Sequence, residues 1–206
     1  MRHRSLFFYS LFLPVFGLFL SNMWMRNAHY QIEQGSKLYV KGTSNVTDFT
    51  CQCLESFPKS QFQIMATNEE TKIRFSKTAL QIRTKKLDCG NKPMNNDMYE
   101  TLKADDYPYI EIELIEARPG KSLDKMNSWV PLEATANITI AGVTRKETLT
   151  VKGMKLDTLQ YRFKSSKALL MTDYGINPPR ALLGLIKVNN EISIELDLFV
   201  TIQEQM

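Results

Sequence analysis

The stretch from Trp129 to Lys155 constrains the fold more than any other, because apolar and polar residues alternate in both of its halves. Apolar residues occupy every second position over residues 132–140, and the alternation resumes after Gly142 in residues 148–151. A period of two predicts strands, whereas a helix needs a period of 3.6. Residues 141–144 supply the turn, since glycine takes a positive φ without a Cβ clash. We predict a long β-hairpin with one apolar and one solvated face.

A hairpin of this length needs further strands to bury its apolar face, so we expect a curved antiparallel sheet, closed into a barrel or folded into a sandwich. Other segments alternate in the same way, and we predict an all-β, antiparallel barrel of roughly eight strands with one or two short helices. One helix is expected within residues 91–106, capped by Asn95 or Asn96, and residues 180–186 are expected to form a short helix or an apolar plug. The predicted strands outside the hairpin are residues 37–42, 49–54, 62–66, 72–76, 79–85, 109–117, 159–170 and 191–203.

Residues 1–28 read as a leader, with Arg2 and Arg4 followed by an apolar run from Leu6 to Leu20. This arrangement is typical of a secretory signal peptide. The alternative is an uncleaved N-terminal anchor, since the run approaches the length that spans a bilayer if residues 23–25 are included. We therefore divide the chain into a signal peptide or anchor, residues 1–28, and a β-barrel domain, residues 29–206, and expect a periplasmic or secreted protein.

The formal charge of +4 comes mainly from the leader, which holds Arg2, Arg4 and Arg26 and no acidic residue. Without these three, 23 basic residues face 22 acidic ones in the predicted barrel domain. A nearly neutral domain with interspersed charges does not fit a surface that neutralises phosphates, so we expect no nucleic-acid partner.

Three cysteines lie in the predicted domain, at Cys51, Cys53 and Cys89. Cys51 and Cys53 are two apart in a predicted strand, so their side chains share a face and do not readily bond to each other. In an exported protein we expect one of them to pair with Cys89, closing a loop of about 35 to 40 residues and leaving the other as a buried free thiol. No metal site is expected, because three thiolates lack a fourth ligand.

Catalytic chemistry finds little support in the sequence. Histidine occurs only at His3 and His29, both outside the predicted strands, which excludes His-based triads and metal sites from the barrel. Glu111 and Glu113 alternate with isoleucines and should face water. We therefore expect no catalytic residue, no cofactor and no enzymatic activity. Composition alone does not separate a packed barrel core from a ligand cavity.

Three stretches resemble the YceI-like family of exported lipid-binding or polyisoprenoid-binding proteins. They are LYVKGTSNVTDFTCQC at residues 38–53, DCGNKPMNNDMYETLKADDYPYIEIEL at residues 88–114, and the segment from ITIAGVTRKETLTVKG to DLFV over residues 138–200. Each motif is modestly specific, but their order along the chain is more so, and together they span nearly all of the predicted domain.

The resemblance implies a lipocalin-like barrel that holds a long apolar chain, such as a polyisoprenoid, without catalysis. The protein would contact the membrane only through the leader or during lipid exchange. We leave homodimer formation undecided, because no residue pattern identifies an interface. The alternative is a packed barrel that acts as a structural or protein-interaction module of the periplasm. The expected apolar ligand contacts are the positions that alternation turns inward, with two leucines of the short segment as a lid or floor: Ile112, Leu114, Ile138, Ile140, Leu149, Val151, Phe163, Leu196, Leu198, and then Leu182 and Leu185.

Overall fold

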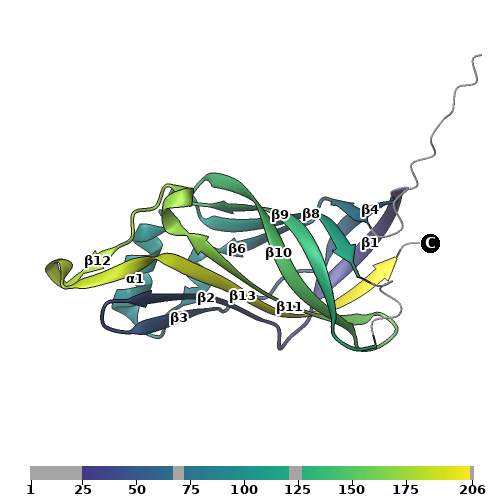
Figure 1. Ribbon diagram of the computed structural model, residues 1–206, viewed down its shortest axis with the longest axis horizontal. Helices are drawn as coiled ribbons and strands as arrows, with labels where there is room; N and C mark the ends of the chain where they lie inside the picture. The colour runs from purple at the N-terminus through teal and green to yellow at the C-terminus, as the bar shows by residue number, and fades with distance from the viewer. Residues whose placement is uncertain (1–24, 67–71, 121–126, 205–206) are drawn as a thin grey trace, which may run out of the picture.

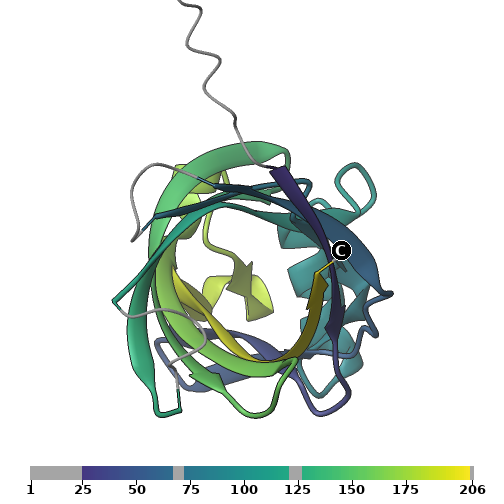
Figure 2. The ribbon, with the colours of Figure 1, turned by 90° about the vertical axis from the view of Figure 1, so that its right-hand side faces the viewer.

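Eight antiparallel strands close into a hydrogen-bonded ring in the computed structural model, which describes residues 25–66, 72–120 and 127–204. Pairing of the first ring strand with the last closes the ring, and Figure 2 looks along its axis. The expected all-β antiparallel barrel is confirmed. In ring order the strands are β1 (Met25–Ile32), β4 (Ser60–Ala66), β5 (Ile73–Ser76), β8 (Tyr109–Pro119), β9 (Val130–Ile140), β10 (Val143–Lys155), β11 (Gln160–Leu170) and β13 (Ile186–Glu204).

Strand pairing changes along the barrel. Along one edge, β8 and β13 each pair with one strand at one end of the barrel and with a different strand at the other end. At one end, which we call the ring end, β13 pairs with β1 and β8 pairs with β5. At the other, the helix end, β13 pairs with β2 and β8 pairs with β6 (Figure 1). The strands and the helix at the helix end are β2 (Lys37–Ser44), β3 (Asp48–Cys53), β6 (Ala79–Arg83), β7 (Leu87–Asp88) and α1 (Lys92–Thr101).

The predicted hairpin is present as β9 and β10, in continuous register from Val143 opposite Ile140 to Gly153 opposite Val130. Ala141 and Gly142 form the two-residue turn with φ values of 48° and 79°. Turns of this kind need positive φ at both positions, and their twist matches that of the flanking strands. The apolar face of β9 is buried along its whole length, with Ala136 fully inaccessible.

The helix expected within residues 91–106 is α1, but its cap differs from the prediction. Asn91 caps it by accepting from the Met94 N–H at 2.9 Å. Asn95 instead lies inside the helix, where its side chain accepts from the Cys89 N–H at 2.6 Å and donates to Asp88 at 2.9 Å. A proline at the start of the helix favours the earlier beginning, since its fixed φ suits the first turn and it needs no N–H partner there.

Residues 180–186 do not form the expected helix or plug. Arg180 and Ala181 form the short strand β12, which pairs back on the start of β13. A 3₁₀ turn over Leu182–Gly184 joins the two strands, with Leu183 at φ 56°. This hairpin extends beyond the helix end of the barrel (Figure 1). The prediction that Leu185 lines the interior is therefore wrong, because this side chain is 74% exposed.

The first strand begins at Met25, four residues before the predicted start of the domain. Ala28 is fully buried and pairs with Phe62 of β4. His29 thus belongs to the barrel wall, contrary to the prediction, but it points outward and contacts Gln61 at 2.7 Å. Residues 1–24, which include nearly all of the predicted leader, lie outside the described residues. None of the described helices has the length and apolar character needed to cross a bilayer.

An ionic cluster fastens β11 to β13 on the outer face. The Asp197 carboxylate accepts from Arg162 through Nε and Nη2, both at 2.8 Å, and lies 3.2 Å from the Lys164 ammonium. These hydrogen bonds, foremost those of Arg162, lower the pKa of Asp197 below its ordinary value of 3.8. Because the three side chains are partly shielded from water, the cluster contributes more than a fully exposed pair would.

Replacing Asp197 with asparagine is expected to lower the free energy of unfolding by about 1 kcal/mol at neutral pH. The folded-state pKa is depressed, so the stabilisation is present above the unfolded pKa and is lost as pH falls through the folded pKa. Urea unfolding at about pH 7 and about pH 2 measures both regimes, with Glu191→Gln, an exposed position of the same strand, as the control. A deficit that persists at the lower pH contradicts the ionic explanation.

Candidate ligand site in the barrel interior

The strand registers place nine of the predicted contact residues on the inward face. Ile112 faces Ile138 across β8 and β9, Leu149 faces Ala134 across the hairpin, and these positions belong to one buried apolar cluster. A register shift at residue 115 in β8 comes after Leu114, so it does not invert the predicted parity. The remaining inward positions follow from their partners: Leu114 opposite Ala136, Ile140 opposite Val143, Val151 opposite Leu132, Phe163 opposite Leu198, and Leu196 opposite Ser165. The side chain of Leu182 lies outside the described part.

The interior is packed unevenly along its length. Near the helix end, large side chains are completely enclosed, including Ile82, Leu87 and Ile138. Toward the ring end, Phe163, Leu196 and Leu198 are only half-buried although they point inward. The inward face is therefore covered less evenly toward the ring end, where Val130, Leu132 and Val200 are buried and these three side chains are not.

A hollow of about 330 Å³ lies at the ring end, where the loop after β1 meets β11 and β13. Tyr161 and Val200, which face each other across β11 and β13, line it together with Leu156. A larger hollow of about 510 Å³ lies against α1, but charged side chains such as Lys85, Glu100 and Asp105 surround it. Glu33, Gln34 and Gln160 line the smaller hollow as well, so it is not predominantly apolar. We favour it as a mouth for a ligand because it borders Tyr161 and Val200 of the inward face.

An ion pair that the sequence analysis missed lies in the barrel wall. Glu147 faces the fully buried Ala136, and Lys167 faces the buried Ile194, so both occupy inward register positions. The Lys167 ammonium lies 2.6 Å from the Glu147 carboxylate, with both side chains mostly shielded. Alternation from Tyr161 through Phe163 would have turned Lys167 inward, and this was the signal available in the sequence.

Tyr174 adds a buried hydroxyl near this ion pair. Its side chain is 1% exposed, and its hydroxyl oxygen has no hydrogen-bond partner among the described residues. Burial, followed by the nearby Glu147 carboxylate, raises the pKa of Tyr174 to about 12, so the group stays protonated. A buried hydroxyl without a partner is a costly arrangement and needs an explanation.

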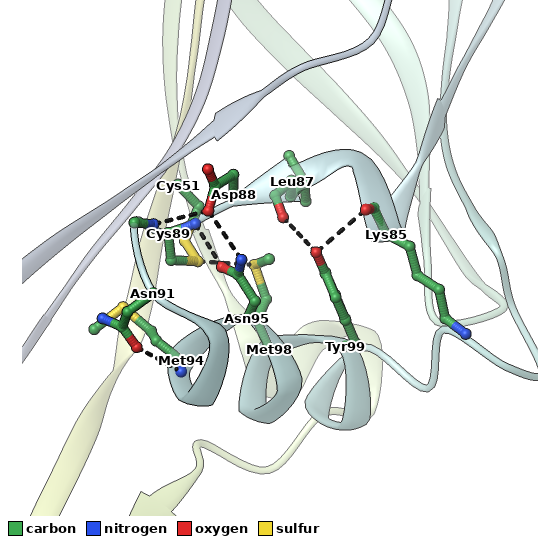
Figure 3. The surroundings of a disulfide bond; sticks show 11 residues. Cys51, Lys85, Leu87, Asp88, Cys89, Asn91, Met94, Asn95, Met98 and Tyr99 are labelled. Carbon is green, nitrogen blue, oxygen red and sulfur yellow. Dashed lines mark hydrogen bonds between the residues drawn. A yellow bond between two sulfur atoms is a disulfide. The ribbon is translucent and has the colours of Figure 1, made fainter.

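A disulfide joins Cys51 of β3 to Cys89, which follows β7 and precedes α1, and it lies at the helix end (Figure 3). Of the two pairings that the sequence left open, the structure has the one with Cys51. Cys53 is a half-buried free thiol whose pKa is raised chiefly by burial. Beside the disulfide, Tyr99 of α1 donates to the carbonyl of Leu87 at 2.9 Å, which holds the helix against β7.

The carboxylates considered for catalysis lie on the outer surface. Glu111 accepts from Gln81 at 2.6 Å and Glu113 accepts from Asn137 at 3.1 Å. Within the described ranges, no three histidine, cysteine, aspartate or glutamate side chains gather closely enough to hold a metal ion. Along the described strands the inward face is mainly apolar, and its polar positions include the Glu147–Lys167 ion pair and Ser165.

A family model described as the YceI-like domain matches residues 27–200. A polyisoprenoid binding domain from Saccharophagus degradans, implicated in plant cell wall breakdown, has a similar structure, with a TM-score of 0.58 and 9% identity over 84% of this chain and 97% of that chain. BcnA from Burkholderia cenocepacia aligns with a TM-score of 0.55 and 12% identity over 82% of this chain and 99% of its own. No curated protein sequence matches. At these identities the structures show a shared fold.

Proposed function

Because this chain belongs to the YceI-like domain family, we propose that it binds a long-chain apolar lipid, of the polyisoprenoid kind, inside its barrel and without catalysis. The observation that carries the proposal is the set of inward-facing apolar side chains that stay half-buried toward the ring end, among them Phe163, Leu196 and Leu198. Phe163 and Leu196 pack against buried clusters but keep part of their apolar surface uncovered, unlike Ile138, and this surface is available to an apolar ligand.

The energetics suit a ligand without polar features over most of its length. Transfer of each methylene from water into an apolar space is worth about 0.8 kcal/mol, so about ten of them give strong binding without a hydrogen bond. The similarity to a structure described as a polyisoprenoid binding domain supports the same ligand class. The signal features of residues 1–28 support an exported protein that acts in the periplasm or outside the cell.

Native mass spectrometry of the purified full chain, followed by organic extraction and lipid analysis, tests this function. We expect one long-chain lipid per barrel, and saturable rebinding of a long-chain polyprenol after the extracted lipid is removed. A protein that carries no lipid and takes up neither a polyprenol nor an isoprenoid hydrocarbon does not have this function.

That outcome would favour a protein-interaction module instead. The observation behind this alternative is the hairpin formed by β12 and β13, where the Leu183 side chain is fully exposed and the Leu185 side chain is 74% exposed. Two exposed leucines on a projecting tip offer an apolar contact to another protein.

A further inference from the structure

The hairpin of residues 180–187, which we call the leucine tip, projects from the helix end of the barrel (Figure 1). Its Leu183 side chain is fully exposed, and its Leu185 side chain is largely so. Aliphatic side chains that stay in water contribute nothing to the hydrophobic stabilisation of the fold. Val46, in the turn between β2 and β3, is 65% exposed and adds apolar surface at the same end of the molecule.

The backbone of the leucine tip is strained at Leu183. This residue has a φ of 56°, in the left-handed region. The conformation is unfavourable for leucine, because its Cβ comes close to the following carbonyl oxygen, whereas glycine and asparagine adopt it more readily. A residue that only turned the chain would be better as either of these. The leucine therefore costs the fold both backbone strain and exposed apolar surface.

The charges of the leucine tip also oppose folding. Arg180 and Lys187 are direct partners in the ladder between β12 and β13, and both side chains are exposed. Like charges directly opposite each other on paired strands are destabilising. The sequence has no acidic residue between Asp173 and Glu191, so the tip itself carries positive charge only. Apolar surface and positive charge are thus combined on one projecting hairpin.

Hydrogen bonds from the turn between β2 and β3 hold the leucine tip in place. The Asn45 side chain donates to the Leu185 carbonyl at 3.0 Å and accepts from the Lys187 N–H at 2.7 Å. The Asn45 N–H donates to the Lys187 carbonyl at 3.1 Å, and the Val188 N–H donates to the Pro179 carbonyl at 3.1 Å. Because the hairpin is already fixed, its docking on a partner requires little further ordering.

We propose that the leucine tip docks the protein on the surface of an anionic phospholipid bilayer. Leu183 and Leu185 insert at the boundary between headgroups and acyl chains, and the two cations contact the headgroups. Such a surface removes apolar side chains from water and attracts the positive charges beside them. Its negative charge also relieves the repulsion between Arg180 and Lys187. The inference goes beyond the proposed function, since docking requires no lipid inside the barrel.

A protein partner fits the leucine tip less well. The residues that dominate protein interfaces are enriched in tryptophan and tyrosine, and leucine is under-represented among them. Residues 180–187 contain three leucines and no aromatic residue. The composition of the tip therefore favours a bilayer over a protein.

A fluorescent label at the leucine tip tests docking directly. Leu183→Cys in a Cys53→Ala background of the full chain carries a thiol-linked NBD group, which is titrated with vesicles of phosphatidylcholine, with or without about 30% phosphatidylglycerol. We expect a blue shift of the emission and binding at least about tenfold tighter to the anionic vesicles. The same label at Ser166→Cys, on the outer face of β11, is the control and should stay in water. Attachment through another part of the chain leaves the tip label unchanged.

Two further variants of the labelled protein separate the contributions of charge and apolar surface. Arg180→Gln combined with Lys187→Gln should weaken binding to the anionic vesicles about 10- to 30-fold. Leu185→Ser should weaken it by about tenfold or more, because a large aliphatic side chain no longer leaves water. Lys152→Gln, at an exposed lysine of β10, is the control for a change of charge and should leave binding unchanged.

The stability of the unlabelled protein supplies a second readout. Leu183→Asn should raise Tm by about 1 to 2 °C, since asparagine takes the left-handed conformation more readily and the fully exposed leucine loses no contact. A leucine that packed into the fold would lower Tm when it is replaced.

Three outcomes overturn the assignment. A tip label whose emission does not shift with the anionic vesicles rules out docking by this hairpin. Equal binding by the labelled protein and by its variant without Arg180 and Lys187 removes the role of the negative headgroups. A label that shifts when the protein concentration is raised without vesicles identifies a second copy of this chain as the partner in place of the bilayer.

Discussion

Replacing both Cys51 and Cys89 with alanine is expected to lower the free energy of unfolding by about 4 kcal/mol. The cysteines are 38 residues apart, and a cross-link over a loop of this length removes much of the conformational freedom of the unfolded chain. Their location adds to the effect. Cys51 is fully buried in β3, and β7 pairs with β3 through two residue pairs, so the disulfide supplements a short ladder.

The measurement is urea unfolding of the double variant in a Cys53→Ala background, which prevents the third thiol from forming a substitute bond. Cys53→Ala alone is the control and should cost about 1 kcal/mol, because that side chain is half-buried. A double variant within about 1 kcal/mol of this control would mean that β3, β7 and α1 hold together without the cross-link.

The hairpin at β9 and β10 could be predicted from the sequence because it satisfies several local rules at once. Its alternation is strict from Leu132 to Ile140, its turn contains Gly142, and its strand residues favour a pleated surface. The same alternation predicted which side chains of the other strands face inward. These predictions concern neighbours within one strand or one turn, where period two determines the face.

Features that depend on distant pairing were missed. The start of β1 at Met25 is set by its pairing with β4, whereas residues 25–28 carry no alternation that would separate them from the leader. Leu185 lies in an apolar segment that is typical of a core, yet β12 pairs back on β13 and Leu185 is exposed. Alternation along β11 turns Lys167 inward, but its partner Glu147 lies on β10 beyond the end of the ladder between these strands. No local pattern reports where two strands stop pairing.

Ser165→Trp is expected to weaken lipid binding by about 100-fold or more. Ser165 faces Leu196 and Val151 on the inward side and is half-buried, so an indole there extends into the apolar space. It would displace about four methylenes of the ligand, a loss of about 3 kcal/mol at about 0.8 kcal/mol each. Loss of the hydrogen bond to the Thr150 carbonyl costs the fold only about 1 kcal/mol. Polyprenol titration of delipidated protein measures the affinity, and urea unfolding checks the fold.

The next residue in the chain provides the matched control. Ser166 faces Glu195 on the outer surface, so Ser166→Trp adds the same side chain to the same strand on the opposite face and should leave lipid affinity unchanged. Two adjacent serines on opposite faces separate an effect of interior volume from an effect of tryptophan itself. If Ser165→Trp binds the polyprenol as tightly as Ser166→Trp does, the ligand does not occupy the barrel near Leu196. The half-buried leucines and Phe163 would then have to be explained as a loosely packed core.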